Sequence, residues 1–255
     1  MAAERKQLDE KSPWWGEHLH RYYEAVKYLR GDETVLDLAC GLGFGTAILA
    51  EKTKNEVVGG DIAEEAITDS KQYWQHLNLT FLILDGTNLP YSDAFFDTLI
   101  SFETIEHTTQ YRQMLREFSR VLKPNGIALI STPNFPINSP TGKVMNPYHT
   151  QEFTHAELLE ILNEVFGEVH IQGQQYSRYK IQSFRNRVGR FAERFFLQRG
   201  IRKIPISLQD RVIKTLINRP IYPEAQDFEM VDGLEDVLKC QTFFAVCKVP
   251  RSITQ

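Results

Sequence analysis

Short apolar runs alternate with amphipathic segments along residues 34–131. Runs with little polar alternation are typical of buried strands, and they occur at residues 34–39, 56–61, 80–85, 97–102 and 127–131. Between them, the spacing of apolar positions predicts helices at residues 46–52, 63–77 and 111–122. This alternation is typical of an α/β fold in which helices connect the parallel strands of one sheet.

The segments on either side extend the pattern. Residues 15–30 are a predicted helix that ends before Gly31, and Thr154 with Glu157 predicts a capping box at the start of another helix. Two further strands are predicted at residues 168–173 and 242–249, which makes seven. The chain is therefore expected to form one domain, residues 1–255, with a helical cap (1–33), a core (34–176 and 240–250) and a helical insertion (177–239).

Composition agrees with a globular protein, since 42% of the 255 residues are apolar and 24% are charged. The three cysteines are odd in number and show no C-x-x-C spacing, which argues against a disulfide framework or a zinc knot. The sequence shows no secretory signal and no apolar stretch long enough to span a bilayer. We expect a cytoplasmic protein.

The predicted insertion is strongly basic. Residues 178–219 hold 12 Lys and Arg against two acidic residues, whereas the rest of the chain holds 17 against 31. Apolar positions recur at helical spacing in residues 181–195, with arginines on the other faces, and residues 208–217 suggest a second helix. Such helices could contact an anionic acceptor or a membrane surface, or could cap the core or a second subunit, which we favour. Because no RNA-binding module is visible, we expect no nucleic-acid partner.

A glycine-rich turn follows the first predicted strand, where Gly41 and Gly43 precede a helix. Glycines at such a turn let the backbone approach a ligand and point helix N–H groups at it. The dinucleotide fingerprint G-x-G-x-x-G would require a glycine at the position of Thr46, which disfavours a nicotinamide-dependent oxidoreductase. The turn therefore predicts a ligand site of another kind.

Acidic residues end the next two predicted strands. Asp61, at the end of the second, is placed to accept hydrogen bonds from a ribose diol. Asp85, Gly86 and Thr87 follow the third and could reach an adenine amino group. Since parallel sheets bind ligands at the carboxyl ends of their strands, the three turns together predict one nucleoside site.

These segments resemble the motifs of class I S-adenosylmethionine-dependent methyltransferases. VLDLACGLGFGT is similar to the first motif of that family, VVGGDI to the second, LILDGTNLPYSDAFFDTLISFETIEH to the third and fourth, and LREFSRVLKPNGIALISTPN to the last two. The resemblance implies a seven-stranded, doubly wound Rossmann-like sheet in the order 3-2-1-4-5-7-6, with the last strand antiparallel. It also implies S-adenosyl-L-methionine as cofactor.

The same resemblance assigns cofactor contacts. Gly41 and Gly43 would pass the methionine moiety, and Ala39 stands where the family pattern has its first glycine. Phe102 would lie near the sulfonium. The full set implied is Asp37, Ala39, Gly41, Gly43, Asp61, Ile62, Asp85, Gly86, Thr87 and Phe102.

Methyl transfer needs mainly positioning, and a hydroxyl acceptor also needs a base to take its proton. His107 and His149, after the fourth and fifth strands, are the candidates, and Asn134, Tyr148 and His149 in a Pro- and Asn-rich loop are candidate acceptor contacts. Asn146-Pro147-Tyr148-His149 resembles a motif of a bacterial subgroup linked to glycan and natural-product pathways. We therefore predict O-methylation of a sugar, a glycan or a small secondary metabolite. An amine acceptor and a catalytically silent cofactor-binding subunit remain as alternatives.

A metal site is a further possibility. Glu103, Glu106, His107 and His149 could hold Mg²⁺ or Mn²⁺, in a spacing that resembles the metal site of 2′-O-methyltransferases acting on small-RNA 3′ ends. Ubiquinone-pathway O-methyltransferases share a similar Glu-x-x-Glu-His. We favour the alternative that Glu106 and His107 only begin the loop after the fourth strand and touch the cofactor carboxylate or the backbone. The sequence leaves the oligomeric state open.

Overall fold

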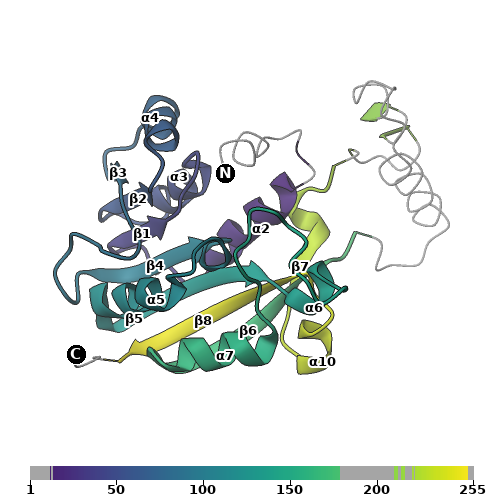
Figure 1. Cartoon of the computed structure of the whole chain (residues 1–255). Helices are drawn as coiled ribbons and strands as arrows, with labels where there is room; N and C mark the ends of the chain where they lie inside the picture. Colours follow the sequence, from purple (N-terminus) through teal and green to yellow (C-terminus); the bar gives the residue numbers. More distant parts are fainter. Residues whose placement is uncertain are drawn as a thin grey trace. The chain divides into compact units, whose positions relative to one another are not determined.

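Eight strands form one sheet in the order β3-β2-β1-β4-β5-β8-β6-β7 in the computed structural model (Figure 1). Neighbouring strands from β3 to β5 are parallel, while β8 runs antiparallel to both β5 and β6. The strands are β1 (Val35–Leu38), β2 (Val57–Asp61), β3 (Leu79–Ile83), β4 (Phe96–Phe102), β5 (Leu122–Pro133), β6 (Phe166–Tyr176), β7 (Phe228–Val231) and β8 (Thr242–Pro250). The seven expected strands follow the expected order, with β8 as the seventh, and β7 adds an edge strand that was not predicted.

The structure describes residues 12, 14–178, 210–211, 214–215, 220 and 222–251. Two compact units divide the chain, one from Tyr22–Gln175 with the segment from Met230, the other from Ala2–Arg21 with Tyr176–Glu229. The helices are α2 (Trp15–Val26), α3 (Phe44–Ala50), α4 (Glu64–Tyr73), η1 (Ile105–His107), α5 (Tyr111–Val121), α6 (Phe135–Asn138), α7 (His155–Asn163), η3 (Ala225–Asp227) and α10 (Leu234–Val237). In the described residues, no helix is long and apolar enough to cross a membrane.

The order of the strands places a switch point between β1 and β4. From β1 the chain moves outward through α3 to β2 and through α4 to β3, whereas β4 connects through α5 to β5 in the opposite direction. Right-handed crossovers in opposite directions put their helices on opposite faces of the sheet. The carboxyl ends of β1 and β4 are therefore the place at which α/β sheets of this order bind ligands.

The predicted apolar face of α5 is confirmed. Met114, Leu115, Phe118 and Val121 are buried in one core cluster together with strand residues and with Leu158, Ile161 and Leu162 of α7. A smaller cluster joins Ile67 of α4 to Cys40 and Phe81. The three cysteines are free and buried, in agreement with the absence of a disulfide framework.

Element boundaries differ from the prediction where tertiary contacts decide them. Helix α4 ends at Tyr73, four residues early, because Trp74 turns to an extended conformation and its indole N–H donates to the Leu42 carbonyl at 2.8 Å. Strand β5 begins at Leu122, five residues early, because Leu122 pairs with Phe96 of β4 across an irregularity in the register. Neither contact is visible in the local pattern.

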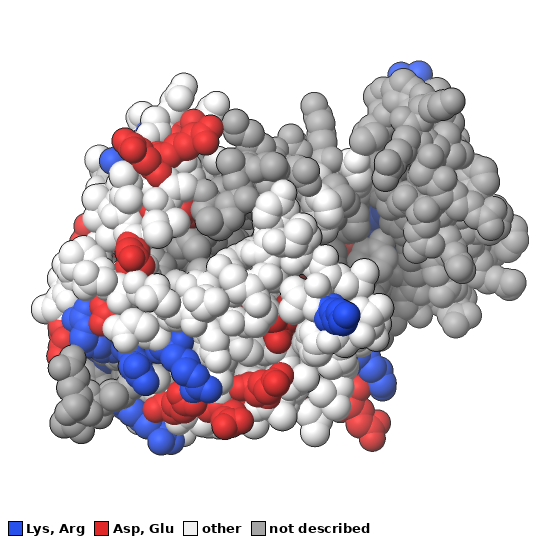
Figure 2. Space-filling view, viewed as in Figure 1, with Lys and Arg blue, Asp and Glu red and all other residues white. Residues whose placement is uncertain are grey.

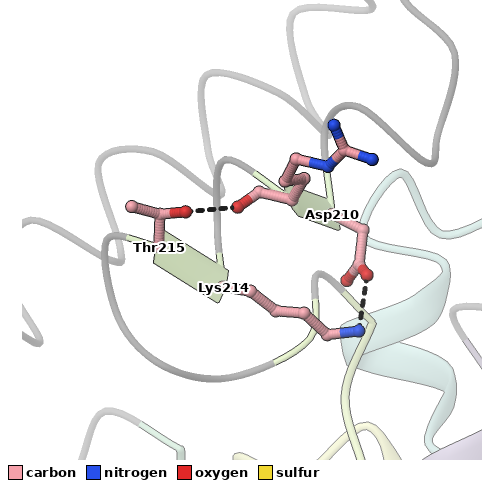
Figure 3. Close-up of a pocket in the computed structure, with 4 residues that line it drawn as sticks. Asp210, Lys214 and Thr215 are labelled. Carbon is pink, nitrogen blue, oxygen red and sulfur yellow. Dashed lines mark hydrogen bonds and ion pairs between the residues drawn. The ribbon is translucent and has the colours of Figure 1, made fainter.

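Only a small part of the basic insertion can be compared with the prediction. The expected helix at residues 181–195 lies outside the described residues. Asp210, Arg211, Lys214 and Thr215 are helical and line a pocket, with an Asp210–Lys214 ion pair at 2.7 Å and a Thr215 hydroxyl that donates to the Arg211 carbonyl (Figure 3). An ion pair one helical turn apart near the surface contributes little to stability. On the visible face of the described residues, acidic and basic side chains are interspersed (Figure 2).

Candidate cofactor and acceptor site

The turn between β1 and α3 has the backbone geometry that its glycines predict. Gly41 and Gly43 adopt left-handed φ values of 56° and 75°, and Ala39, where a glycine was expected by resemblance, adopts 61°. A Cβ on Gly43 would lie 2.6 Å from the Phe81 ring, whereas a Cβ on Gly41 would meet no atom within 4 Å. The backbone at Gly41 therefore borders open space, and Ala39 accepts a conformation that costs an L-residue about 1–2 kcal/mol.

Ser70 of α4 and Trp74, the residue after this helix, hold the turn, and the sequence did not single them out. The Ser70 hydroxyl donates to the Gly41 carbonyl at 3.2 Å, and the Trp74 indole donates to the Leu42 carbonyl at 2.8 Å. The Cys40 amide also donates to the Gly60 carbonyl of β2 at 3.0 Å. Hydrogen bonds thus hold the turn at each of residues 40–42. In the sequence, the only indication of Ser70 was its place on the buried face of the predicted helix.

Asp61 joins the ends of β1 and β2. Its carboxylate accepts the Gly41 amide at 3.0 Å and the Ala63 amide at 2.9 Å, and the residue is 2% exposed. The next residue, Ile62, is 60% exposed, which is unusual for a large apolar side chain at the end of a buried strand. A carboxylate fixed at the glycine turn beside an open apolar surface suits a ligand with a polar diol and a flat ring.

The third turn and the end of β4 complete this edge of the sheet. Asp85 remains exposed, and its carboxylate accepts the backbone amide and the hydroxyl of Thr87 at 2.8 and 2.7 Å. A Cβ on Gly86 would come within 2.7 Å of Leu38, so the chain approaches β1 closely there. Phe102 is buried at the end of β4.

Asp37 lies beneath the glycine turn and is 1% exposed. Its carboxyl group accepts the Thr46 hydroxyl at 2.6 Å and the Tyr22 hydroxyl, which lies 3.2 Å from both oxygens. Burial raises the pKa of Asp37 to about 7, although the two hydroxyl donors oppose this shift. Asp37 therefore ties α2 and α3 to the end of β1 through hydrogen bonds.

Tyr22 of α2 lies against the same end of the sheet. Its ring packs edge-on against Phe44 and Phe102, with centroids 5.3 and 5.1 Å away, and a Cβ on Gly45 would overlap it. The α2 segment at Tyr22 thus covers the start of α3 and reaches the end of β4. The helical spacing of aromatic residues was the signal, but it did not distinguish Tyr22 from Tyr23, which is exposed.

The raised pKa of Asp37 predicts that the free energy of unfolding depends on pH. The raised pKa means that folded protein keeps a proton that unfolded protein releases between about pH 4 and pH 7, so stability falls as pH rises through this window. From about pH 4 to pH 7, we expect the free energy of unfolding of the wild type to fall by about 4 kcal/mol more than that of Asp37→Asn. The variant has no carboxylate whose charge must be buried. Urea unfolding of both proteins across this range measures the difference. A difference independent of pH would contradict the assignment.

His107 stands at the end of β4, in η1, and one of its ring nitrogens is engaged. Its Nδ1 lies 3.0 Å from the Tyr148 carbonyl, an acceptor only, so Nδ1 carries the proton in the neutral ring. Nε2 then presents a lone pair, 4.0 Å from Oε1 of Glu106, and the side chain is 19% exposed. Glu106 is buried and accepts the Thr132 hydroxyl at 2.9 Å.

His149 lies close to His107 but has both nitrogens occupied. Its Nδ1 contacts Oε1 of Glu152 at 2.8 Å, and its Nε2 contacts the Asn146 side-chain amide at 2.9 Å. The rings of the two histidines meet edge to face with centroids 4.9 Å apart. The structure thus brings together the two candidate bases, but only His107 keeps a ring nitrogen without a hydrogen bond to the chain.

Asn134 does not occupy the place predicted for it. It is buried, and its side-chain amide donates to the carbonyls of Leu238 and Cys240 at 3.1 and 2.8 Å. Both amide hydrogens therefore tie the end of β5 to the segment before β8. We leave Asn134 out of the acceptor site, whereas Tyr148 is exposed beside His107 and remains in it.

Comparison with known proteins agrees with this geometry. Residues 29–185 match the family model of a methyltransferase domain. A protein of Mycolicibacterium smegmatis described as a "Probable S-adenosylmethionine-dependent methyltransferase" is 32% identical over 163 residues, 64% of this chain and 62% of the relative. The chain belongs to the class I S-adenosylmethionine-dependent methyltransferase family.

Two further proteins are similar to this chain. Phosphoethanolamine N-methyltransferase 3 of Arabidopsis thaliana is 33% identical over 105 residues, 40% of this chain and 21% of that protein. The structure of an S-adenosylmethionine-dependent methyltransferase from Archaeoglobus fulgidus matches with a TM-score of 0.59 at 17% identity, over 97% of this chain and 98% of that one. The match spans about three fifths of the length of the first curated relatives.

The methyltransferase site fits S-adenosylmethionine. The open space beside Gly41 is where a glycine lets a ligand approach the backbone, and the Asp61 carboxylate holds that same amide. A carboxylate oxygen has two acceptor sites, so the residue types at positions 61 and 62 suit a ribose diol beside an adenine ring. S-adenosylmethionine, when bound there, supplies an electrophilic methyl group.

The residues fit a divalent cation less well. Ligand atoms of Glu106, His107 and His149 lie within 4.8 Å of one another. A cation would nevertheless have to displace the Asn146 amide from His149, because the other nitrogen of that ring is held by Glu152. Glu103 is not in this cluster, since its carboxylate accepts the Ser131 hydroxyl at 2.9 Å.

Proposed function

We propose that this chain transfers the methyl group of S-adenosylmethionine to a hydroxyl oxygen of a sugar, a glycan or a small secondary metabolite, with His107 as the general base. The observation that carries the proposal is the tautomer of His107. Its Nδ1–H is held by the Tyr148 carbonyl, and Nε2 is left as a proton acceptor at the partly exposed end of β4. A fixed imidazole with one accepting nitrogen is the arrangement that deprotonates a hydroxyl.

Each group of the site has a part in this proposal. The glycine turn and Asp61 orient the cofactor, which brings its methyl group in line with the acceptor oxygen. His107 takes the acceptor proton at Nε2, and the nearby Glu106 carboxylate stabilises the imidazolium that forms. Tyr148, which is exposed next to this base, offers a ring on which an acceptor can pack.

An amine acceptor is the second candidate. The similarity to a relative named phosphoethanolamine N-methyltransferase supports it, over 40% of this chain. A neutral amine attacks without a base, so its methylation would depend little on His107. The two candidates therefore separate in the pH dependence of kcat and in the effect of a His107 substitution.

The test is transfer of a labelled methyl group from S-adenosylmethionine across a panel of sugars, nucleotides, phenols and amines. We expect a hydroxyl compound to be methylated, with a rate that rises with pH along a histidine-like limb. Methylation of amines alone would replace the proposed acceptor class. Binding of the cofactor without transfer to any member would favour a cofactor-binding subunit.

Metal removal gives a separate prediction. Because both nitrogens of His149 and the carboxylate of Glu103 are held by hydrogen bonds, we expect methyl transfer to be unchanged by a chelator. The rate is compared before and after dialysis against EDTA, then after addition of Mg²⁺ or Mn²⁺. Loss of activity that either cation restores would show that the cluster binds a metal.

A further inference from the structure

The loop between α6 and α7 contains a motif of which only Tyr148 has a role in the proposed reaction. Residues 146–152 carry Asn, Tyr, His and Glu at fixed spacing, and each of these four residues makes a hydrogen bond to another part of the loop or to η1. We propose that Glu152 and His149 are positioning residues that hold the base, His107, through this loop. The inference rests on the proposed function, since it assigns the device that orients the same base.

Glu152 is the buried end of the network. Its side chain is 1% exposed, and its two oxygens contact Nδ1 of His149 at 2.8 Å and accept the Ser139 hydroxyl at 2.7 Å. The Ser139 hydroxyl in turn accepts the Met145 amide at 3.0 Å. A buried carboxylate is costly unless it is hydrogen-bonded at both oxygens, and here both are satisfied. Glu152 therefore holds the loop in one conformation through two hydrogen bonds that an apolar residue could not make.

The carboxylate also sets the direction of the hydrogen bonds made by His149 and Asn146. Because Glu152 accepts the proton of His149 Nδ1, Nε2 of that ring is an acceptor and takes the Asn146 side-chain N–H. The Asn146 oxygen is then turned to the Tyr148 amide, which donates to it at 3.0 Å. The Tyr148 carbonyl finally accepts Nδ1–H of His107 at 3.0 Å. Hydrogen bonds within the loop therefore connect Glu152 to Tyr148, whose carbonyl holds the ring of the base.

The same loop holds the backbone that carries His107. The Thr150 amide and hydroxyl donate to the Glu106 carbonyl at 2.8 and 3.0 Å. The Gln151 side-chain amide donates to the carbonyls of Ile105 and Thr108 at 3.0 and 2.7 Å. Ring and backbone of the base are thus placed by residues more than 40 positions later in the chain. A shift of this loop would move Nε2 relative to the acceptor, and small misplacements are expensive in transfer reactions.

Glu152→Ala is the first test, measured with an acceptor that the wild type methylates. We expect kcat to fall about 10- to 100-fold, because the loop that holds His107 loses its buried anchor and the base loses its fixed position, while the affinity for S-adenosylmethionine stays within twofold. The pH dependence of kcat should change as well, because a base whose ring is no longer held in place meets the acceptor proton in a different geometry. Glu152→Gln, which can still accept from His149 and donate to Ser139, should recover most of the rate.

Two controls separate positioning from stability. Asn146 is half-buried, and Asn146→Ala removes two hydrogen bonds of the same network. If Glu152→Ala does not fold, Asn146→Ala should still show the loss of kcat. Glu33→Gln changes another buried carboxylate, one that accepts the backbone amides of residues 30–32 and pairs with the Arg30 side chain, and should lower Tm without moving kcat or its pH limb.

The outcomes distinguish this inference from the proposed function. Unchanged kcat and pH limb in Glu152→Ala and in Asn146→Ala, with an inactive His107→Ala, would overturn the positioning proposal and leave the base in place. An active His107→Ala would overturn both. A fall in Tm alone for Glu152→Ala would show that the network serves stability only.

Discussion

Replacing His107 with alanine is expected to lower kcat for a hydroxyl acceptor by about 10²- to 10⁴-fold, the usual contribution of a general base. The variant loses the nitrogen that accepts the proton, and the Tyr148 carbonyl loses its donor. The remaining rate should lack the low-pH limb of the wild type. Binding of S-adenosylmethionine should stay unchanged, because none of the hydrogen bonds of the glycine turn involves His107. Steady-state kinetics across pH, with calorimetry for the cofactor, measure both effects.

His170→Ala provides the matched control. His170 is 61% exposed, on β6, and its ring contacts the Asp232 carboxylate at 2.7 Å at the surface. Its removal should leave kcat and the pH profile unchanged. If His107→Ala retains the wild-type rate with a hydroxyl acceptor while His170→Ala behaves in the same way, His107 is not the base.

Replacing Asp61 with alanine is expected to raise the Kd for S-adenosylmethionine and for S-adenosylhomocysteine by about 100-fold or more. Hydrogen bonds to a charged group contribute about 1.5–3 kcal/mol each, and the variant would lose those to both ribose hydroxyls. It would also release the Gly41 and Ala63 amides, which the carboxylate now holds at 3.0 and 2.9 Å. Calorimetric titration of the folded variant with each ligand measures the change.

Asp97→Ala controls for the loss of an aspartate that holds backbone. Asp97 accepts the Thr34 amide at 3.0 Å and the Lys123 ammonium at 2.7 Å at the start of β4, away from the glycine turn. This variant should be less stable but should bind both ligands as the wild type does. Equal affinity of Asp61→Ala and wild type for S-adenosylhomocysteine would show that the cofactor is not held at the end of β2.

The geometry of the turns at which we propose that the cofactor binds could be predicted because its signals are local. The glycine turn, Asp61 and Asp85 each follow directly on a buried strand, and consecutive parallel strands end at one edge of the sheet. The left-handed conformations of Gly41 and Gly43 follow from their residue type. Ser70 and Trp74 were not predicted, because a side chain that bonds a carbonyl some 30 residues away leaves no trace in the pattern of its own helix.

The acceptor half illustrates the opposite case. Asn134 lies in a loop whose composition is typical of substrate contacts, yet its amide is used by two carbonyls more than 100 residues later. Glu152 stands directly before a helix in an ordinary loop sequence, so nothing local distinguishes it from a solvent-exposed glutamate. Its burial depends on Ser139 and His149, which the fold of the loop brings to it.

The amino-acid sequence by itself determined the strands of the sheet and the edge at which a nucleoside would lie, because periodicity and turn chemistry act over a few residues. The order of the seven expected strands came from the resemblance to the methyltransferase family. Only the tertiary structure decided which of two histidines can accept a proton, since each tautomer is set by a partner brought from elsewhere: the Tyr148 carbonyl for His107 and Glu152 for His149. It likewise placed the Tyr22 hydroxyl on Asp37, where burial raises the pKa of the carboxyl group. Hydrogen bonds between distant segments form only after the chain has folded, so these assignments could not be made from local pattern.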